Sequence, residues 1–158
     1  MLSQFNALST KIDGRYATDV ELQFIADYTA SYELRKHVYL KLQSLESKIV
    51  SAVFERIRAS DPKLLERGDE NLANKWRQDT IRVLRYSAIA VLLDDAAMHQ
   101  ERFLFWFQTV MRAFATQKSC DVTYTIMQEV IEQYLQPLEL QLVQPIIELN
   151  RAALGVAA

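Results

Sequence analysis

The sequence predicts an all-α fold, and three observations support this class. Half of the 158 residues are apolar, while only three are glycine and three are proline, the residues that most often interrupt helices. Apolar residues recur at steps of three and four over most of the chain, which is the period of a helix with one buried face. No strand pair and no repeat period are evident. A chain of this length can bury one sizeable core, so we expect a single domain over residues 1–158.

The first long helix is predicted from Val20 to about Ala59. Apolar side chains recur along it at helical steps, with charged residues such as Lys41 and Glu46 between them. The pattern fits one long helix or two continuous ones.

A short helical turn is expected next, because Asp61 offers an N-cap oxygen and Pro62 suits the first helical position. The turn runs through Leu64 and Leu65, and Gly68 ends it. A polar segment, residues 67–74, then leads into the following helix.

That following helix carries its apolar residues on one broad side, from Trp76 to Val91. Asp94 and Asp95 interrupt the pattern and predict a helix end followed by a new N-cap. The helical segment after them, from Met98 to about Ala115, is the most aromatic part of the chain.

Five aromatic residues lie in this segment. Phe103, Phe107 and Phe114 share one helical stripe and are predicted to be in the core. Consecutive aromatic residues point around a helix, so at least one of Phe105 and Trp106 must leave the core and cover a pocket or a contact surface.

Two helices are expected in the C-terminal part. Ser119 or Asp121 can cap the first, and Pro137 starts or bends the second. Pro145 lies inside the last apolar pattern and predicts a kink, because proline removes a backbone donor and clashes with the preceding turn. The number and lengths of these helices are typical of globin-like folds.

The composition disfavours several classes of function. The net charge is -2 with both signs interspersed, so neither a nucleic acid nor an anionic membrane surface is an expected partner. No apolar run approaches the roughly 20 residues that span a bilayer, and the first residues lack the basic start and apolar stretch of a secretory signal. We therefore expect a cytoplasmic protein. The lone Cys120 allows no intramolecular disulfide, which suits a reducing compartment.

The sequence offers no recognisable enzyme or metal site. It contains no glycine-rich phosphate loop, no nucleophile elbow and no spaced cluster of cysteines and histidines. Haem would need an axial nitrogen ligand, but His37 lies beside charged residues in the long helix, and a capping or surface role is simpler for His99. Neither an enzymatic activity nor a bound metal is expected.

Several motifs carry a resemblance to a known family. They are Gly14-Arg15-Tyr16 near the start, then Trp76-Arg77-Gln78-Asp79, Leu84-Arg85-Tyr86, Asp95 and Glu101-Arg102. These motifs resemble those of the phycobiliproteins, the bilin-carrying antenna subunits of cyanobacteria, which are globin-like with two extra N-terminal helices. The match extends from about residue 14 to about residue 115, and the last third of the chain is matched only by its helical pattern.

The resemblance implies an altered pigment site. Trp76 stands where the family's bilin-attaching cysteine belongs, and an indole cannot form a thioether. Gln78 replaces the arginine that pairs with a bilin propionate, whereas Asp79 matches the aspartate that bonds the pyrrole nitrogens. Trp106 replaces a small residue near the pigment, so both tryptophans predict a filled or reshaped pocket.

No covalent cofactor is therefore expected at this site. A bilin held without a covalent bond is the alternative, and Asp79, Arg77, Trp76 and Trp106 are then its candidate binding residues. A surface aspartate is the simpler interpretation of Asp79. Cys120 lies far from the family's attachment position and is interpreted as a small apolar filler, with a substitute attachment point as the alternative.

The resemblance also implies a contact between subunits. The candidate interface residues are Asp13, Arg15, Tyr16, Arg85 and Asp95, with Asp13 or Asp19 as the partner of Arg85 across the interface and an ion pair within one chain as the alternative. Residues 1–33 are expected to form a helical dimerisation extension. The partner would be a second copy of the chain or a phycobiliprotein-like subunit.

The predicted function is that of a phycobiliprotein-like globin without a covalent pigment, similar to the bilin-biosynthesis-associated globins. Such a protein would act through protein contacts in bilin supply, in phycobilisome assembly or turnover, or in the regulation of light harvesting. The alternatives are a non-covalent carrier of a bilin or other tetrapyrrole, and a colourless minor phycobilisome subunit. A carrier needs a cavity of roughly a few hundred cubic ångströms, whereas tight packing of both tryptophans would exclude it.

Overall fold

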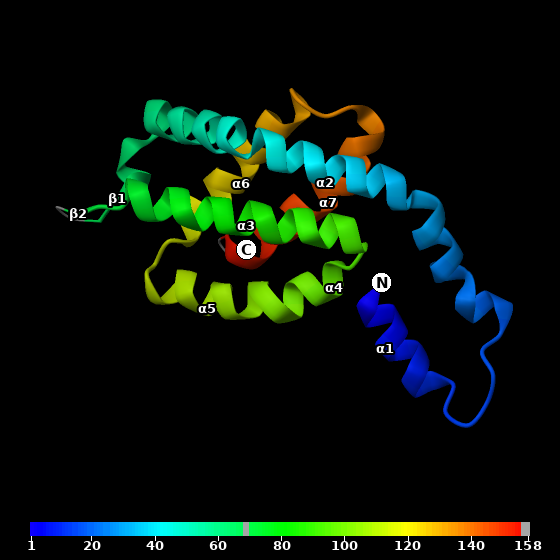
Figure 1. Ribbon diagram of the computed structural model, residues 1–158. Helices are drawn as coiled ribbons and strands as arrows, with labels where there is room; N and C mark the ends of the chain where they lie inside the picture. Colours follow the sequence, from blue (N-terminus) through cyan, green and yellow to red (C-terminus); the bar gives the residue numbers. More distant parts are fainter. Residues whose placement is uncertain (68–69, 156–158) are drawn as a thin grey trace.

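The computed structural model describes residues 1–67 and 70–155, and within them the chain is helical apart from one short hairpin (Figure 1). The elements in chain order are α1 (Leu2–Lys11), α2 (Asp19–Ser60), η1 (Pro62–Leu65), β1 (Glu66–Arg67), β2 (Glu70–Asn71), α3 (Ala73–Leu93), α4 (Ala96–His99), the π-helical η2 (Gln100–Leu104), α5 (Phe105–Ala113), α6 (Gln117–Glu132) and α7 (Pro137–Leu154). The predicted all-α, globin-like class is confirmed. The antiparallel pair β1–β2 was not predicted.

α2 is one continuous helix of 42 residues, and the sequence explains its start. The Thr18 hydroxyl accepts a hydrogen bond from the backbone N–H of Glu21, and the Glu21 carboxylate accepts one from the backbone N–H of Thr18. This reciprocal capping box satisfies two amides that the first turn leaves unpaired. Of the two predicted arrangements for residues 20–59, the single long helix is the correct one.

Residues 1–33, which we call the arm, extend away from the rest of the molecule (Figure 1). No residue before Arg35 is buried. Within the arm, Phe5 of α1 packs edge to face on Phe24 of α2 at 5.0 Å between ring centroids. The arm is also joined to α4, because the backbone N–H of Ser3 donates to Asp95 Oδ2 at 2.7 Å.

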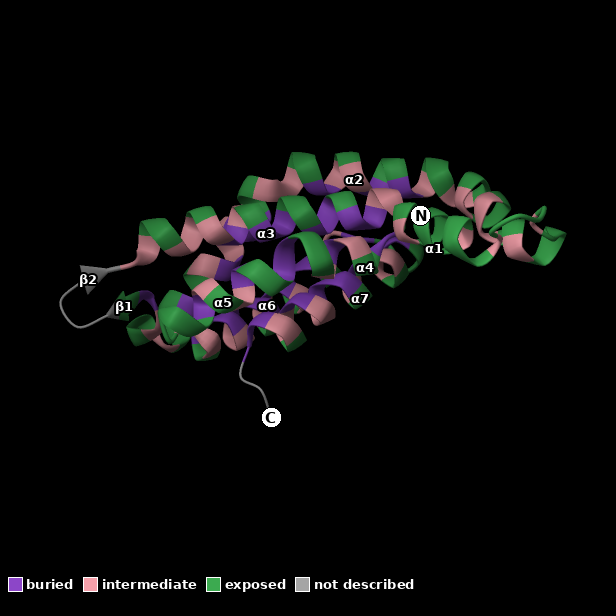
Figure 2. Cartoon of the chain, turned by 90° about the horizontal axis from the view of Figure 1, so that it is seen from below, coloured by how far each residue is buried: buried purple, intermediate pink, exposed green. Residues whose placement is uncertain are grey.

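The remainder, which we call the body, holds the core. α2 packs against α3 and α6, and α7 packs against α6 and α3. Figure 2 shows the buried residues along the facing sides of these helices and the exposed residues along α1. The core is therefore built by α2, α3, α6 and α7, while α4, η2 and α5 complete it from the other side of α3 and α7.

A buried arginine marks the boundary between the arm and the body. Arg35 is 2% exposed, and its guanidinium donates to the carbonyl oxygens of Tyr28 at 2.6 Å and of Leu92 at 3.2 Å, and to the hydroxyl of Ser31. Its guanidinium carbon also lies 4.2 Å from the centre of the Tyr28 ring. Leu92 is in the last turn of α3, where helix carbonyls lack intrahelical partners, so Arg35 fixes α2 to the end of α3.

The break predicted at Asp94 and Asp95 is confirmed. Asp94 ends α3 in the left-handed conformation, with φ of 49°. Asp95 then caps α4, because its carboxylate accepts a hydrogen bond from the backbone N–H of Met98 at 2.9 Å. A residue with a side chain thus adopts the conformation that glycine adopts most easily.

The other predicted helix ends agree only in part. Pro62 starts η1 as expected, although Asp61 makes no side-chain cap, and the end predicted at Gly68 lies outside the described residues. The prediction that Ser119 or Asp121 caps the next helix is wrong. α6 begins two residues earlier than Ser119, directly after a left-handed turn in the chain at Ala115.

The last helix starts where it was predicted. Pro137 occupies its first turn, and Gln136 and Glu139 form a capping box around it. Pro145 lies inside α7, which continues beyond it to Leu154.

Candidate functional site

A pocket of about 90 Å³ lies among η1, α3, α5 and α6. Its apolar wall consists of Leu64, Leu72, Trp76, Phe107, Met111 and Phe114. Its polar wall consists of Lys75, Asp79, Thr80, Thr116, Ser119, Cys120, Thr123 and Tyr124. We call this cavity the inner pocket.

Trp76 spans the space between three helices at the edge of the inner pocket. Its indole Nε1–H donates to the hydroxyl of Thr123 on α6 at 2.9 Å. Its ring lies against Phe54 of α2, with 5.6 Å between ring centroids. The indole therefore occupies volume between α2, α3 and α6, at the position where the sequence motif led us to expect a narrowed pocket.

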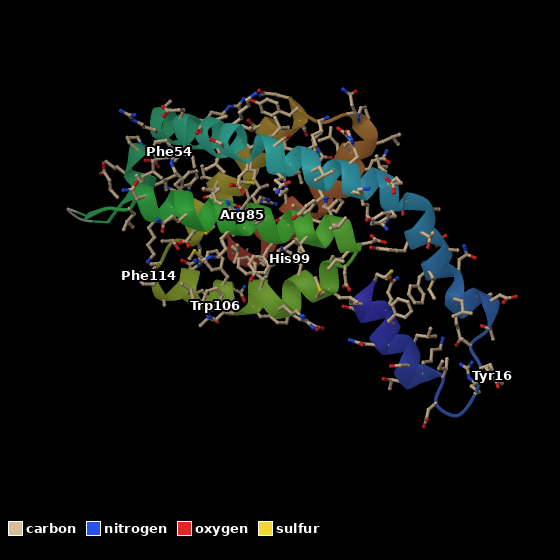
Figure 3. The ribbon with its side chains drawn as sticks, viewed as in Figure 1. Tyr16, Phe54, Arg85, His99, Trp106 and Phe114 are labelled. Atoms are coloured by element: carbon tan, nitrogen blue, oxygen red, sulfur yellow. The ribbon has the colours of Figure 1, made fainter. Side chains whose placement is uncertain are left out.

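Trp106 lies elsewhere, on the surface of α5 (Figure 3). It is 55% exposed and touches Phe107 from outside, with 5.7 Å between ring centroids. The prediction that Trp106 helps to fill the pocket is therefore wrong. One residue along a helix turns the side chain by about 100°, so Phe107 faces inward and Trp106 faces solvent.

The aromatic stripe on this segment was predicted correctly for two of its three members. Phe103 and Phe107 are buried, and Phe105 and Trp106 both leave the core. Phe114 is 41% exposed, so its predicted place in the core is wrong. α5 ends at Ala113, and Phe114 consequently departs from the helical stripe and borders the inner pocket.

Arg77 also lies outside the inner pocket. Its guanidinium carbon is 4.9 Å from the centre of the Phe54 ring, and one of its nitrogens is 3.5 Å from the hydroxyl of Ser51. Arg77 thus packs on α2. Of the four candidate binding residues, the structure brings Trp76 and Asp79 together and separates Arg77 and Trp106 from them.

Asp79 is a poorly solvated carboxylate at the edge of the inner pocket. Its side chain is 22% exposed, and the nearest cation is Arg82, 3.6 Å away. Burial raises the pKa of Asp79, against the smaller opposing effects of the positive charges of Arg82 and Lys75. Asp79 is therefore an incompletely paired acceptor for a hydrogen-bond donor.

Cys120 shares the inner pocket with Asp79, so the expectation that it lies far from this site fails in three dimensions. The packing of α6 across α3 brings it there. Burial and the nearby charge of Asp79 raise the pKa of the Cys120 thiol to about 12. The thiolate is the nucleophilic form, so Cys120 is a weak nucleophile at neutral pH.

Three hydroxyl groups in the polar wall have no hydrogen-bond partner among the described residues. They belong to Thr80, Ser119 and Tyr124, which are only 3%, 9% and 3% exposed. Burial, followed by the proximity of Cys120 and Asp79, raises the pKa of Tyr124 well above its usual range, so its phenol is neutral. No pattern in the sequence predicts this group, because its members come from two helices that meet only in the fold.

His99 belongs to a separate buried network, so its predicted surface or capping role is wrong (Figure 3). Its Nε2 lies 2.7 Å from Asn150 Oδ1, and Asn150 Nδ2 donates to the hydroxyl of Ser87 at 2.8 Å. Burial lowers the pKa of His99 more than the bond to Asn150 raises it. The neutral ring therefore joins α4 to α7 and, through Ser87, to α3.

A second cavity, of about 260 Å³, lies between α2 and α3, and we call it the outer pocket. Its lining residues are Tyr39, Leu42, Gln43, Glu46, Leu84, Arg85, Ala88 and Ile89. Arg85 forms a two-bond ion pair with Glu46, at 2.7 and 2.8 Å, and this pairing raises the pKa of Arg85. The ion pair within the chain, which was the alternative for Arg85, is thus present, and the side chain is still 65% exposed.

The remaining interface candidates differ in accessibility. Tyr16 is 97% exposed at the far end of the arm (Figure 3). Asp13, three residues earlier in the chain, is also exposed. Arg15 is held by two hydrogen bonds to Glu21. Asp95 is 4% exposed and bonded to the arm of its own chain, so its predicted contact with a partner subunit is wrong.

The described residues hold neither a grouped metal site nor a membrane-spanning helix. Within residues 1–67 and 70–155, no three histidine, cysteine or acidic side chains are grouped so that they could hold a metal ion. No helix in these ranges combines the length and the apolar character needed to cross a membrane. The two pockets and the arm are therefore the features that bear on function.

Both pockets and most of the arm lie in the part of the chain that matches one protein family. The family described as phycobilisome protein matches residues 8–154, from within α1 to the end of α7. No match is found among curated proteins. Since the matched range includes the motif around Trp76, the turn at Tyr16 and every helix of the core, this chain belongs to the phycobilisome protein family.

Proposed function

We propose that this protein is a phycobiliprotein-like subunit without a covalently bound bilin, which acts by binding other subunits in bilin supply, in phycobilisome assembly or turnover, or in the regulation of light harvesting. Proteins of this family have structural and light-harvesting roles rather than enzymatic ones, and they assemble with partner subunits in phycobilisomes. The observation that carries the proposal is Trp76, which stands where the resemblance places the attaching cysteine and whose indole packs between Thr123 and Phe54.

The inner pocket does not fit a tetrapyrrole. Its volume is about 90 Å³, whereas pockets for ligands of drug size or larger span roughly 300–1,000 Å³. Arg77, a candidate partner for a propionate, is turned toward α2. The size and the lining of the pocket therefore favour contact with proteins over carriage of a bilin.

Covalent attachment at another position also finds little support. Cys120 is the one cysteine of the chain. It is 8% exposed, and its pKa of about 12 leaves almost no thiolate at neutral pH.

The outer surface supplies the features that a protein contact requires. Tyr16 presents nearly its whole side chain to solvent, and the outer pocket of about 260 Å³ is large enough to receive an aromatic ring. Arg85 at the rim of that pocket offers a positive charge to an acidic residue such as Asp13. In the proposed pair, each chain places the turn at Tyr16 in the outer pocket of its partner, a reciprocal arrangement typical of two-fold symmetric dimers.

A pigment titration tests the first half of the proposal. Phycocyanobilin and, separately, haemin are added to wild type, Trp76→Ala and Trp106→Ala, with absorbance spectra and zinc-stained denaturing gels as the readouts. We expect no red-shifted complex in wild type or Trp106→Ala, and weak, non-covalent binding after Trp76→Ala opens the pocket. A stoichiometric complex in wild type that releases its pigment on denaturation would instead establish the carrier, and a covalent one would make Cys120 the attachment point.

Sedimentation tests the second half. Wild type is compared with Tyr16→Ala, Arg85→Ala and the control Phe105→Ala, which removes an exposed aromatic ring from α5. Each protein is measured alone and after mixing with purified phycobilisomes. We expect association to weaken in the first two variants only. Equal sedimentation of all four proteins would rule out the arm and the outer pocket as the contact.

A further inference from the structure

We infer that the inner pocket binds a small molecule built on a single aromatic ring of five or six atoms that carries an N–H or cationic donor. This site goes beyond the proposed function, because contacts with partner subunits make no use of it. The inference rests on the size of the cavity, its aromatic walls and its unpaired polar groups.

Size limits the occupant to one ring. The cavity measures about 90 Å³, whereas one water takes about 30 Å³ of liquid and an engineered apolar cavity of about 150 Å³ holds benzene. A five-membered ring therefore fits, and a six-membered ring is at the limit of this volume. Lys75 and Phe114, both exposed, meet at the border of the pocket with the ammonium 3.7 Å from the ring centre.

The walls favour a flat ring. Trp76 and Phe107 supply aromatic surfaces from α3 and α5, and Met111 supplies a thioether that packs well against aromatic rings. The bond from Trp76 Nε1–H to Thr123 holds the indole in place, so this wall is formed before a ligand arrives.

The polar wall determines the chemistry of the ligand. Thr80, Ser119 and Tyr124 are more than nine-tenths buried and line the cavity, yet their hydroxyls meet no partner among the described residues. Buried polar groups in folded proteins are nearly always hydrogen-bonded, to protein, to water or to a ligand. The one fully enclosed side-chain polar atom without a partner among the described residues is His99 Nδ1, so these three oxygens are reached from the cavity, and a ligand with polar ring atoms can bond to them there.

The charge in the pocket favours a donor over an anion. Among the described residues of the lining, Asp79 is the one carboxylate, and its salt bridge to Arg82 is long, at 3.6 Å, whereas the cation of the lining, Lys75, lies over the Phe114 ring at the border. A ring N–H or a cation would bond to this carboxylate, whereas an anionic ring would be repelled by it.

Imidazole is a suitable probe, because it has one five-membered ring and an N–H donor. The two indole N–H signals in a ¹H–¹⁵N spectrum report on the site, because Trp76 borders the pocket and Trp106 does not. We expect the Trp76 signal to shift saturably with imidazole while the Trp106 signal stays in place. 1-Methylimidazole above its pKa, which has no N–H, and benzoate, which is anionic, should bind at least about fivefold more weakly.

Variants identify the groups that bind the ring. Asp79→Asn and Tyr124→Phe should each weaken imidazole binding about three- to tenfold, the loss expected for one hydrogen bond. Tyr134→Phe removes the same atom outside the pocket and should leave binding unchanged. Thr80→Val replaces Tyr124→Phe if circular dichroism shows that the latter is unfolded.

Two results would overturn the inference. One is the absence of a saturable shift of the Trp76 signal up to the solubility limit of imidazole, which would leave water as the occupant. The other is equal affinity in wild type, Asp79→Asn and the hydroxyl variant. Neither result depends on a partner subunit, so both are distinguishable from a failure of the proposed contact function.

Discussion

The two sides of α3 differ in how their side chains are held. On the inner side, Trp76 is bonded to Thr123 and packed on Phe54, and it narrows a small pocket. On the outer side, Arg85 forms an exposed ion pair at the rim of a larger pocket. The inner side should therefore respond to substitution with a loss of stability, and the outer side with a loss of association.

The largest expected effect is a loss of stability when the packing on the inner side of α3 is disrupted. Trp76→Ala should reduce the free energy of unfolding by about 3 kcal/mol, because a large side chain and its hydrogen bond are lost from a packed site. Trp106→Ala makes the same change at a position that is 55% exposed and should cost less than about 1 kcal/mol. Urea denaturation of both variants measures the difference, and equal losses would mean that Trp76 is not a packed residue.

A second pair compares two arginines. Arg35→Ala should cost about 2–3 kcal/mol, because the half-buried carbonyl oxygens of Tyr28 and Leu92 lose a charged donor. Arg85→Ala removes an exposed ion pair, which solvent screens, and should cost much less than Arg35→Ala. Thermal unfolding measures both, and a smaller loss for Arg35 than for Arg85 would contradict the assignment of Arg35 as the anchor of α2.

The pH dependence of stability tests the contact between the arm and α4, where Asp95 accepts a hydrogen bond from Ser3. Burial acts to raise the pKa of Asp95, but hydrogen bonds from Ser3 and Met98 outweigh it and lower the pKa from 3.8 to about 2. The folded state therefore binds fewer protons than the unfolded state, and the stabilisation is complete above about pH 4 and disappears as the pH falls toward 2.

Asp95→Asn should accordingly cost about 2 kcal/mol at pH 7 and very little at pH 2. The exposed Asp13→Asn is the control and should change little at either pH. Urea denaturation of wild type and both variants at several pH values gives the comparison. A cost for Asp95→Asn that stays constant from pH 7 to pH 2 would show that the charge of Asp95 contributes nothing.

The smallest expected effect is a gain in the stability of the fold. Asp94→Gly should stabilise the fold by about 0.5–1 kcal/mol, because glycine adopts the left-handed conformation at this position without the cost that a side chain incurs. Glycine also gives the unfolded chain more freedom, which limits the gain. Thermal unfolding detects it, and a lower melting temperature would show that the Asp94 side chain contributes more than its backbone conformation costs.

The helices were predictable where local signals set them. The period of apolar residues located α2 and α3, and Asp94, Asp95 and Pro137 marked helix ends, because capping and proline act through neighbouring residues. The start of α6 was misplaced, since the turn at Ala115 has no such signal. The candidate site was predictable only for Trp76 and Asp79.

The rest of the site depends on packing between distant segments. The burial of His99 requires Asn150 from α7, and the hydroxyls of the inner pocket come together only when α6 crosses α3. The exposure of Trp106 follows from which side of α5 faces the core, and the π-helical turn of η2 lies immediately before that helix. No pattern of neighbouring residues determines these relations.

The continuity of α2 has a mechanical consequence. At about 1.5 Å per residue, the helix reaches about 24 Å from Arg35 outward to Asp19 and about 28 Å from Arg35 inward to Phe54. Arg35 holds it between these ends, and Phe54 touches the indole of Trp76. The helix thus connects the arm to the wall of the inner pocket without a break. A force applied to the arm can therefore be transmitted past Arg35 to Phe54 and Trp76.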